Sequence, residues 1–137
     1  MSPWFIEFLQ EPASRSVPAR EFLEDCPLSV ATKFASVLKA IAEAPPPVFN
    51  GGGYWEAMHG EMAGYYELRI DGPQRRHYRL FCLLENPGTG VGLKGPSLVV
   101  LCGMEKPFRT TFSKRDYARV RELGERFLSC VPRPVAR

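Results

Sequence analysis

The sequence has no long apolar run. Apolar residues make up 45% of its 137 residues, an ordinary share for a folded domain, but no uninterrupted stretch approaches the ~20 residues that a membrane-spanning helix needs. The N-terminal segment MSPWFIEFLQEP has no basic residue before its apolar run and carries Glu7 within it, which argues against a secretory signal. We therefore expect a cytoplasmic protein without a membrane partner.

Cysteine is scarce and scattered. The four cysteines are Cys26, Cys82, Cys102 and Cys130. They form no C-x-x-C pair, a pattern that suits small buried side chains in a reducing compartment better than disulfides or zinc ligands. The fragment HGE at 59–61 matches the H-x-E of zinc deaminases, but the cysteine pair that would complete such a site is missing. The sequence thus predicts no metal site.

The sequence contains one glycine pattern typical of nucleotide-binding loops, but its neighbours do not suit such a loop. Residues 90–95 spell G-x-G-x-x-G, but Pro96 and an apolar strand follow them, whereas the dinucleotide fingerprint requires a helix to begin there. We interpret residues 85–97 as a long hairpin connection and expect no cofactor.

Charge is distributed unevenly along the chain. The net charge is +3, yet residues 1–62 hold four basic and eight acidic side chains, while residues 63–137 hold fourteen basic and seven acidic ones. This segregation favours a polyanionic partner for the C-terminal half. A solvated basic face without a partner is the alternative.

Hydrophobic spacing predicts one α+β domain. Apolar runs predict strands at 4–9, 65–70, 77–84 and 97–104, and helical spacing predicts helices at 17–25, 29–44 and 113–127. This order, β-α-α-β-β-β-α, predicts an antiparallel β-meander sheet with an N-terminal helical hairpin and a C-terminal helix packed on it. The domain spans residues 1–131, and residues 132–137 are expected to be a disordered tail.

Side-chain chemistry predicts where these helices begin and end. Ser16 is expected to cap the first helix, and Ser113 the last, with Asp116 completing a capping box. The prolines at 45–47 are expected to stop the second helix. The glycine-rich segment 48–64 is expected to be a loop.

The predicted hairpin over residues 65–85 is unusually rich in cationic side chains. Strand alternation places Glu67 and Arg69 on one face of the first strand, and His77 and Arg79 on one face of the next. If Arg69 pairs with Arg79, two guanidinium groups converge and repel unless an anion lies between them. The alternative is that each arginine pairs with a nearby carboxylate such as Asp71.

The segment after the apolar strand at 97–104 adds further cations. Lys106 and Arg109 follow this strand directly, and in a meander Lys106 can join Arg69 and Arg79 in one groove. Aromatic residues are interleaved with these cations: Tyr65, Tyr78, Phe108 and Phe112. Basic groups hold phosphates and aromatic faces stack on bases, so this composition is typical of a groove for single-stranded nucleic acid.

The stretch GYYELRIDGPQRRHYRLFCLLE, followed by an apolar strand and GMEKPFRTTFSKRDYARVRELGERF, resembles the HigB/RelE superfamily of bacterial and phage toxins, in particular its HigB-type, phage-derived branch. The resemblance covers about residues 60–127. It implies a RelE-like fold and the toxin of a type II toxin–antitoxin system, a ribosome-dependent mRNA endonuclease (mRNA interferase). Its partners would be the ribosome, mRNA and a cognate antitoxin, expected to be a helix-turn-helix protein.

The motifs of this family assign roles by position. Arg69 is the arginine of E-L-R, Arg79 that of Y-R-L, and Lys106 the lysine after the last strand. Pro107 stands where the family usually has a second lysine, and Phe112 where it has a proline.

RNA cleavage without a metal requires attack of the ribose 2′-OH on the adjacent phosphorus. We expect Arg79 and Lys106 to stabilise the charge that develops. His77 is the candidate base because imidazole changes charge near neutral pH, and a lysine whose pKa is depressed by basic neighbours is the alternative. The residues expected to bind RNA are Arg69, Arg75, Arg76, Tyr78, Arg109 and Thr111.

Two other functions suit the same fold. One is a ParE-like toxin that inhibits DNA gyrase and is not a nuclease. The other is a non-catalytic module that binds nucleic acid or protein.

Overall fold

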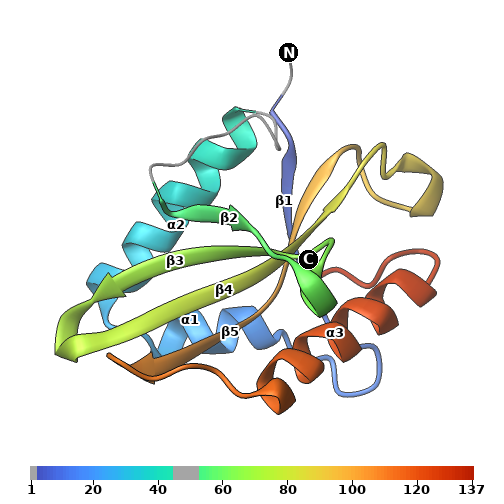
Figure 1. Ribbon diagram of the computed structural model, residues 1–137. Helices are drawn as coiled ribbons and strands as arrows, with labels where there is room; N and C mark the ends of the chain where they lie inside the picture. Colours follow the sequence, from blue (N-terminus) through green and yellow to red (C-terminus); the bar gives the residue numbers. More distant parts are fainter. Residues whose placement is uncertain (1–2, 45–52) are drawn as a thin grey trace.

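The computed structural model describes residues 3–44 and 53–137 (Figure 1). These residues form five strands and three α-helices, which confirms the α+β class. The elements are β1 (Phe5–Phe8), α1 (Pro18–Asp25), α2 (Leu28–Glu43), β2 (Trp55–Ala57), β3 (Tyr66–Gly72), β4 (Arg76–Glu85), β5 (Ser97–Pro107) and α3 (Lys114–Ser129).

The strands form one mixed sheet in the order β1-β5-β4-β3-β2. Strands β2, β3, β4 and β5 run antiparallel to one another in this order, as the predicted meander requires. Strand β1 lies parallel to β5 at the edge of the sheet. The prediction of a loop over 48–64 is wrong for β2. This short strand is held by Trp55, which is buried and stacks on Tyr66 with ring centres 4.8 Å apart.

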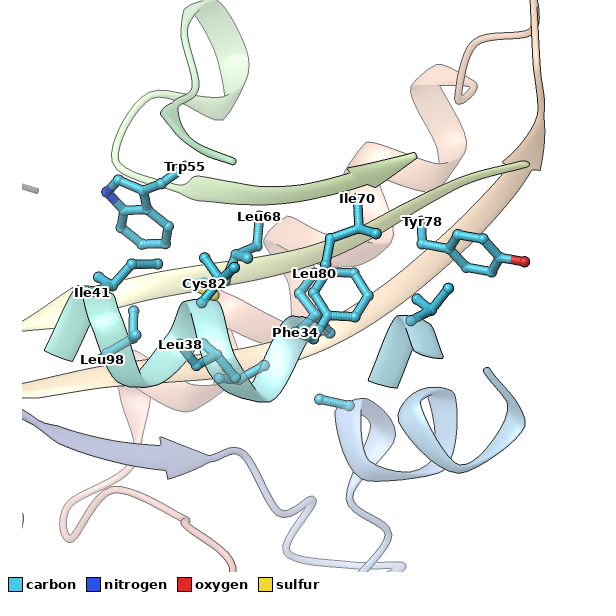
Figure 2. Close-up of a cluster of buried hydrophobic side chains, with 14 residues drawn as sticks. Phe34, Leu38, Ile41, Trp55, Leu68, Ile70, Tyr78, Leu80, Cys82 and Leu98 are labelled. Carbon is cyan, nitrogen blue, oxygen red and sulfur yellow. The ribbon is translucent and has the colours of Figure 1, made fainter. Parts of the chain in front are cut away.

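Helices cover both faces of the sheet (Figure 1). Helices α1 and α2 pack on one face, where Phe34, Leu38 and Ile41 of α2 meet apolar side chains of β3, β4 and β5 (Figure 2). Helix α3 packs on the other face through Val120 and Phe127. The helical spacing in the sequence therefore identified the buried stripes of α2 and α3 correctly. No helix in the described ranges is both long and apolar enough to cross a membrane.

One of the two predicted helix caps is present. Ser113 accepts a hydrogen bond from the Asp116 amide at 3.1 Å, and the Asp116 carboxylate accepts one from the Ser113 amide at 2.8 Å, which completes the capping box. The cap expected at Ser16 is wrong, because Ser16 donates its hydroxyl to Glu11 instead and Val17 precedes α1. The prolines at 45–47 lie outside the described residues.

A β-bulge in β5 changes which face its side chains occupy. Phe81 pairs with Cys102 and Cys82 with Val100, so Leu101 is the extra residue. Before the bulge, even-numbered residues such as Val100 face α1 and α2; after it, Met104 faces α3. Since side chains alternate along a strand, Lys106 also faces α3.

The C-terminal tail is ordered, which corrects the prediction of disorder for 132–137. Val135 forms a β-bridge with Leu9, and the Ala136 amide donates to the Phe8 carbonyl at 2.8 Å. Arg133 forms an ion pair with Glu85 at 2.7 Å. The tail continues the sheet beyond β1, so its backbone is paired rather than left to solvent.

Candidate active site

Arg69 and Arg79 lie directly opposite each other on β3 and β4, on the face that α3 covers. Three rows of side chains cross β3, β4 and β5 on this face. They are Glu67–Phe81–Cys102, Arg69–Arg79–Met104 and Asp71–His77–Lys106. We call Arg69, His77, Arg79 and Lys106 the cationic cluster. The strand register and the β5 bulge together bring its four members to one side of the sheet.

Arg79 is the most buried member of the cluster, with 4% of its surface exposed. Its Nη1 donates to Asp71 Oδ1 at 3.1 Å, to the Tyr78 carbonyl at 2.9 Å and to the Ile70 carbonyl at 3.4 Å. Its Nε and Nη2 donate to no described residue. One side of the guanidinium group is thus fixed by the sheet, and the other two nitrogens keep donors for an anion.

Arg69 is more exposed and has two carboxylate neighbours. Its Nη1 lies 2.7 Å from Glu56 Oε2, and its Nε lies 3.6 Å from Glu67 Oε1. The alternative that the arginines pair with local acids therefore holds for both Arg69 and Arg79. Glu56 and Glu67 thus lie beside Arg69, and Asp71 is shared by Arg79 and His77.

Lys106 is the cluster member without a carboxylate within ion-pair distance among the described residues. Its Nζ lies 4.3 Å from the centre of the Phe112 ring, a cation–π contact. Burial lowers the pKa of Lys106, and the nearby Arg79 lowers it further. An anion placed between Lys106 and Arg79 would relieve this repulsion.

His77 is oriented by a carboxylate. Its Nδ1 hydrogen-bonds Asp71 Oδ1, the same oxygen that accepts from Arg79. Burial would raise the pKa of Asp71, but these hydrogen bonds from His77 and Arg79 outweigh burial and lower it. With Nδ1–H directed at a carboxylate, Nε2 is the nitrogen that can accept a proton, as a general base requires. The His77 ring also packs against Phe108, with centres 4.7 Å apart.

Two further residues at this site were absent from the predicted set. Glu67 lies two residues before Arg69 on the same face, and burial raises its pKa although Arg79 and Arg69 oppose the shift. Tyr117 of α3 packs edge-on against Phe81, and burial together with Glu67 raises its pKa. Strand alternation had already placed Glu67 on the correct face. Tyr117 has no such signal, because its spacing within α3 marks it only as a residue of the helix face that packs on the sheet.

Two of the predicted RNA-binding residues lie elsewhere. Tyr78 is fully buried in the core between the sheet and α1 and α2, with its hydroxyl 3.4 Å from the Pro73 carbonyl (Figure 2). This placement contradicts the prediction that Tyr78 contacts RNA, because no ring face is left for a base. Arg76 lies on the same side of β4 as Tyr78 and pairs with Glu105 at 2.9 Å, so it is outside the cluster.

The remaining predicted RNA-binding residues lie at the margin of the site. The Arg75 guanidinium is 5.8 Å from the centre of the Phe108 ring, which also contacts His77. Arg109 and Thr111 are exposed between β5 and α3. Arg109 adopts a positive φ of 66°, which is uncommon for a residue other than glycine.

Groups that could bind a metal are not found in the described part of the chain, where no three His, Cys, Asp or Glu side chains are suitably grouped. The four cysteines are free thiols. Burial raises the pKa of the Cys26 thiol to about 11, with smaller contributions from Glu105 and Asp25. The Cys26 thiol is therefore a poor nucleophile.

Comparison of the chain with models of protein families gives no match, and comparison with curated proteins gives no significant match either.

Proposed function

We propose that the chain is a RelE-like toxin of the HigB type, which cleaves mRNA on the ribosome without a metal cofactor and is neutralised by a cognate antitoxin. The observation that carries the proposal is the convergence of Arg69, Arg79 and Lys106 on one face of the sheet. Of the side chains that border these cations, His77 and Glu67 can exchange protons. This combination matches the needs of 2′-OH attack on a phosphodiester.

The cations have a defined role in this reaction. As the 2′-oxygen attacks, negative charge accumulates on the non-bridging phosphate oxygens, and Arg79 and Lys106 offer donors to them. Arg79 is fixed by its bonds to Asp71 and to two carbonyls, so its remaining donors need little reorganisation. Preorganised donors of this kind are worth roughly 3–4 kcal/mol of transition-state stabilisation each.

Proton transfer is assigned to His77 as the base and to Glu67 or Tyr117 as the acid. His77 Nε2 takes the proton from the 2′-OH, with Asp71 stabilising the imidazolium that forms. Glu67, whose pKa is raised by burial, or the Tyr117 hydroxyl supplies a proton to the 5′-oxygen of the leaving nucleotide.

One observation favours a non-catalytic binding module as the second candidate. Arg69, His77 and Arg79 each already contact a carboxylate, and such pairs also occur where charges serve structure alone. Under this alternative the cluster stabilises the sheet, and the protein binds a partner without cutting RNA.

Controlled expression in bacteria separates these functions. We expect the wild-type chain to arrest growth and to produce new mRNA 5′ ends within ribosome-bound codons. Lys106→Ala should abolish both effects while the protein stays folded, because Lys106 forms no ion pair with any residue in the described ranges 3–44 and 53–137. Lys94→Ala, an equal loss of charge at an exposed residue of the connection between β4 and β5, is the matched control and should behave as wild type.

The other outcomes identify the alternatives. Growth arrest with intact mRNA would point to a ParE-like gyrase inhibitor. A harmless product that leaves mRNA intact would support the binding module and contradict the nuclease.

A further inference from the structure

A hollow of about 340 Å³ lies beside the cationic cluster, between the 3-10 turn at Gly60–Met62 and the first turns of α3. Three of its lining residues, Lys114, Tyr117 and Arg121, come from one face of α3, where spacings of three and four residues align side chains. Its apolar lining is formed by Met58 and Met62.

Tyr117 connects this hollow to the candidate active site. The Tyr117 ring lines the hollow and also lies 6.0 Å from the Phe112 ring, measured between centres. Lys106 Nζ in turn lies 4.3 Å from the centre of the Phe112 ring. A nucleotide strand whose phosphate lies at Lys106 can therefore pass along Phe112 and Tyr117 and place a flanking base in the hollow.

The lining of the hollow suits a nucleobase. Tyr117 and His59 supply rings against which a base can stack, and the methionine side chains adapt to a flat apolar surface. Glu61 and Arg121 lie 3.9 Å apart, so they present an acceptor and donors next to each other. Such a pair can bond to the amino and carbonyl groups on the edge of a base.

A free anion or a purely apolar ligand fits this lining less well. Glu61 would repel a simple phosphate, and the exposed rim of His59, Glu61 and Lys114 is polar. By contrast, the larger hollow between the β1–α1 connection and the end of α3 is mainly apolar, with Leu9 and Phe127 in its lining.

We infer that the hollow at Tyr117 is a subsite for one base of single-stranded RNA, next to the phosphate held by the cationic cluster. This inference rests on the proposed function for the identity of the polymer. The subsite makes base preference a property of the 3-10 turn and α3 together, set by His59 and Glu61 on one side and Arg121 on the other, while the cluster holds the backbone of any sequence.

The test uses the whole chain and 2′-O-methyl hexaribonucleotides, which bind but cannot be cleaved by 2′-OH attack. NMR titration of the wild type should shift the signals of Met58 and Tyr117. His59→Ala and Lys114→Ala should each weaken binding at least about fivefold, the lower limit for loss of one base stack or one phosphate contact. Arg115→Ala is the matched control, because Arg115 is the exposed neighbour of Lys114 and does not line the hollow.

Glu61→Gln tests base reading directly. It should change which base is preferred at one position of the hexamer and leave affinity for the other positions unchanged. The inference is overturned if wild type binds no oligonucleotide, or if His59→Ala, Lys114→Ala and Glu61→Gln all bind like Arg115→Ala.

Cleavage maps from the same variants separate this result from the proposed function. Cleavage with unchanged base preference in all variants would overturn the subsite and leave the nuclease standing. Binding with altered base preference but no cleavage by wild type would support the subsite and contradict the nuclease.

Discussion

Glu67 is a carboxylate in a position that disfavours its charge. It lies directly opposite the buried Phe81, in the row next to Arg69 and Arg79, and burial raises its pKa despite those arginines. A residue selected for stability alone would be neutral here, since desolvating a charge costs free energy. Its presence is consistent with a proton-transfer role, because active sites commonly retain groups that reduce stability.

Desolvation of the Glu67 carboxylate should make the stability of the protein depend on pH. Because the folded protein holds the Glu67 proton more tightly than the unfolded chain, stability falls as pH rises from the unfolded pKa through the raised folded pKa. Glu67→Gln should therefore raise the free energy of unfolding at pH 7, and the gain should vanish below about pH 4, where the carboxyl is protonated in both states. Urea denaturation at both pH values checks this. The exposed Glu122→Gln is the control, and an equal gain there would contradict the argument.

Arg79 combines a structural role and a proposed catalytic role, and two substitutions separate them. Arg79→Ala removes the donor to Asp71 and to two carbonyls, so we expect the free energy of unfolding to fall by about 1–3 kcal/mol. Arg79→Lys retains the charge and should fold, but it loses the fixed donors. We expect mRNA cleavage by Arg79→Lys to fall about 100-fold.

Chemical denaturation and primer-extension maps of cut mRNA measure the two effects of the Arg79 variants. Cleavage by Arg79→Lys at the wild-type rate would show that the guanidinium group has no catalytic role.

At the scale of elements, α3 positions the aromatic side of the site. Its capping box at Ser113 lies directly after Phe112 and four residues before Tyr117. The start of α3 therefore sets the distance between the Phe112 ring, which contacts Lys106, and the Tyr117 ring, which lines the hollow.

Ser113→Ala should lower the free energy of unfolding by about 1 kcal/mol, the usual effect of losing a helix N-cap. It should also weaken RNA binding, because the first turn of α3 carries Lys114 and Tyr117. Ser129→Ala is the matched control at the other end of α3, where the hydroxyl donates only to the exposed Arg126 carbonyl. Thermal melts should show a larger loss for Ser113→Ala; equal losses would contradict a special role for the cap.

The long periodic elements were predictable from sequence, and the short or irregular ones were not. Apolar spacing located α2, α3 and the three long strands because their buried stripes are continuous. Strand β2 has only three residues and follows a glycine-rich segment, so no periodicity could reveal it. The tail was missed because its order comes from Arg133 and from backbone pairing with β1, contacts that are distant in sequence.

The site was partly predictable for the same reason. Alternation along β3 and β4 correctly placed Arg69 with Arg79, and the register depends only on the short hairpin between them. Lys106 reached the same face through the β5 bulge, which simple alternation from Val100 would not provide. The prediction for Tyr78 was wrong. Its aromatic ring, next to cationic residues in the sequence, suggested a surface on which a base could stack, but the alternation of β4 directs the ring into the core.

For the molecule as a whole, the C-terminal tail is joined to the body of the domain through contacts of Arg133. The Arg133–Glu85 pair is largely buried, and Arg133 Nη1 also donates to the Leu128 and Cys130 carbonyls at 2.9 Å and 2.8 Å. Loss of one partner would leave Glu85 and both carbonyls without a donor.

Arg133→Ala should thus reduce the free energy of unfolding by about 3 kcal/mol, as expected when one member of a buried pair is removed. The matched control is Arg126→Ala, whose pair with Glu11 is exposed on the arginine side and should contribute at most about 1 kcal/mol. Guanidinium denaturation of both variants measures the difference. Similar values for the two would show that the tail is not a stabilising part of the fold.

The carboxylates beside the cationic cluster should affect how RNA affinity depends on ionic strength. A bare basic groove gains affinity by releasing condensed counterions from RNA, whereas here Glu56, Glu67 and Asp71 already occupy the cations. The slope of log affinity against log salt should thus be shallower than about −2, the value for three uncompensated phosphate contacts on a single strand. Glu56→Gln would remove the nearer of the two carboxylates beside Arg69, so the slope should steepen and affinity at low salt should rise. Under the proposed function, the carboxylates would limit indiscriminate attraction of RNA and leave discrimination to specific contacts.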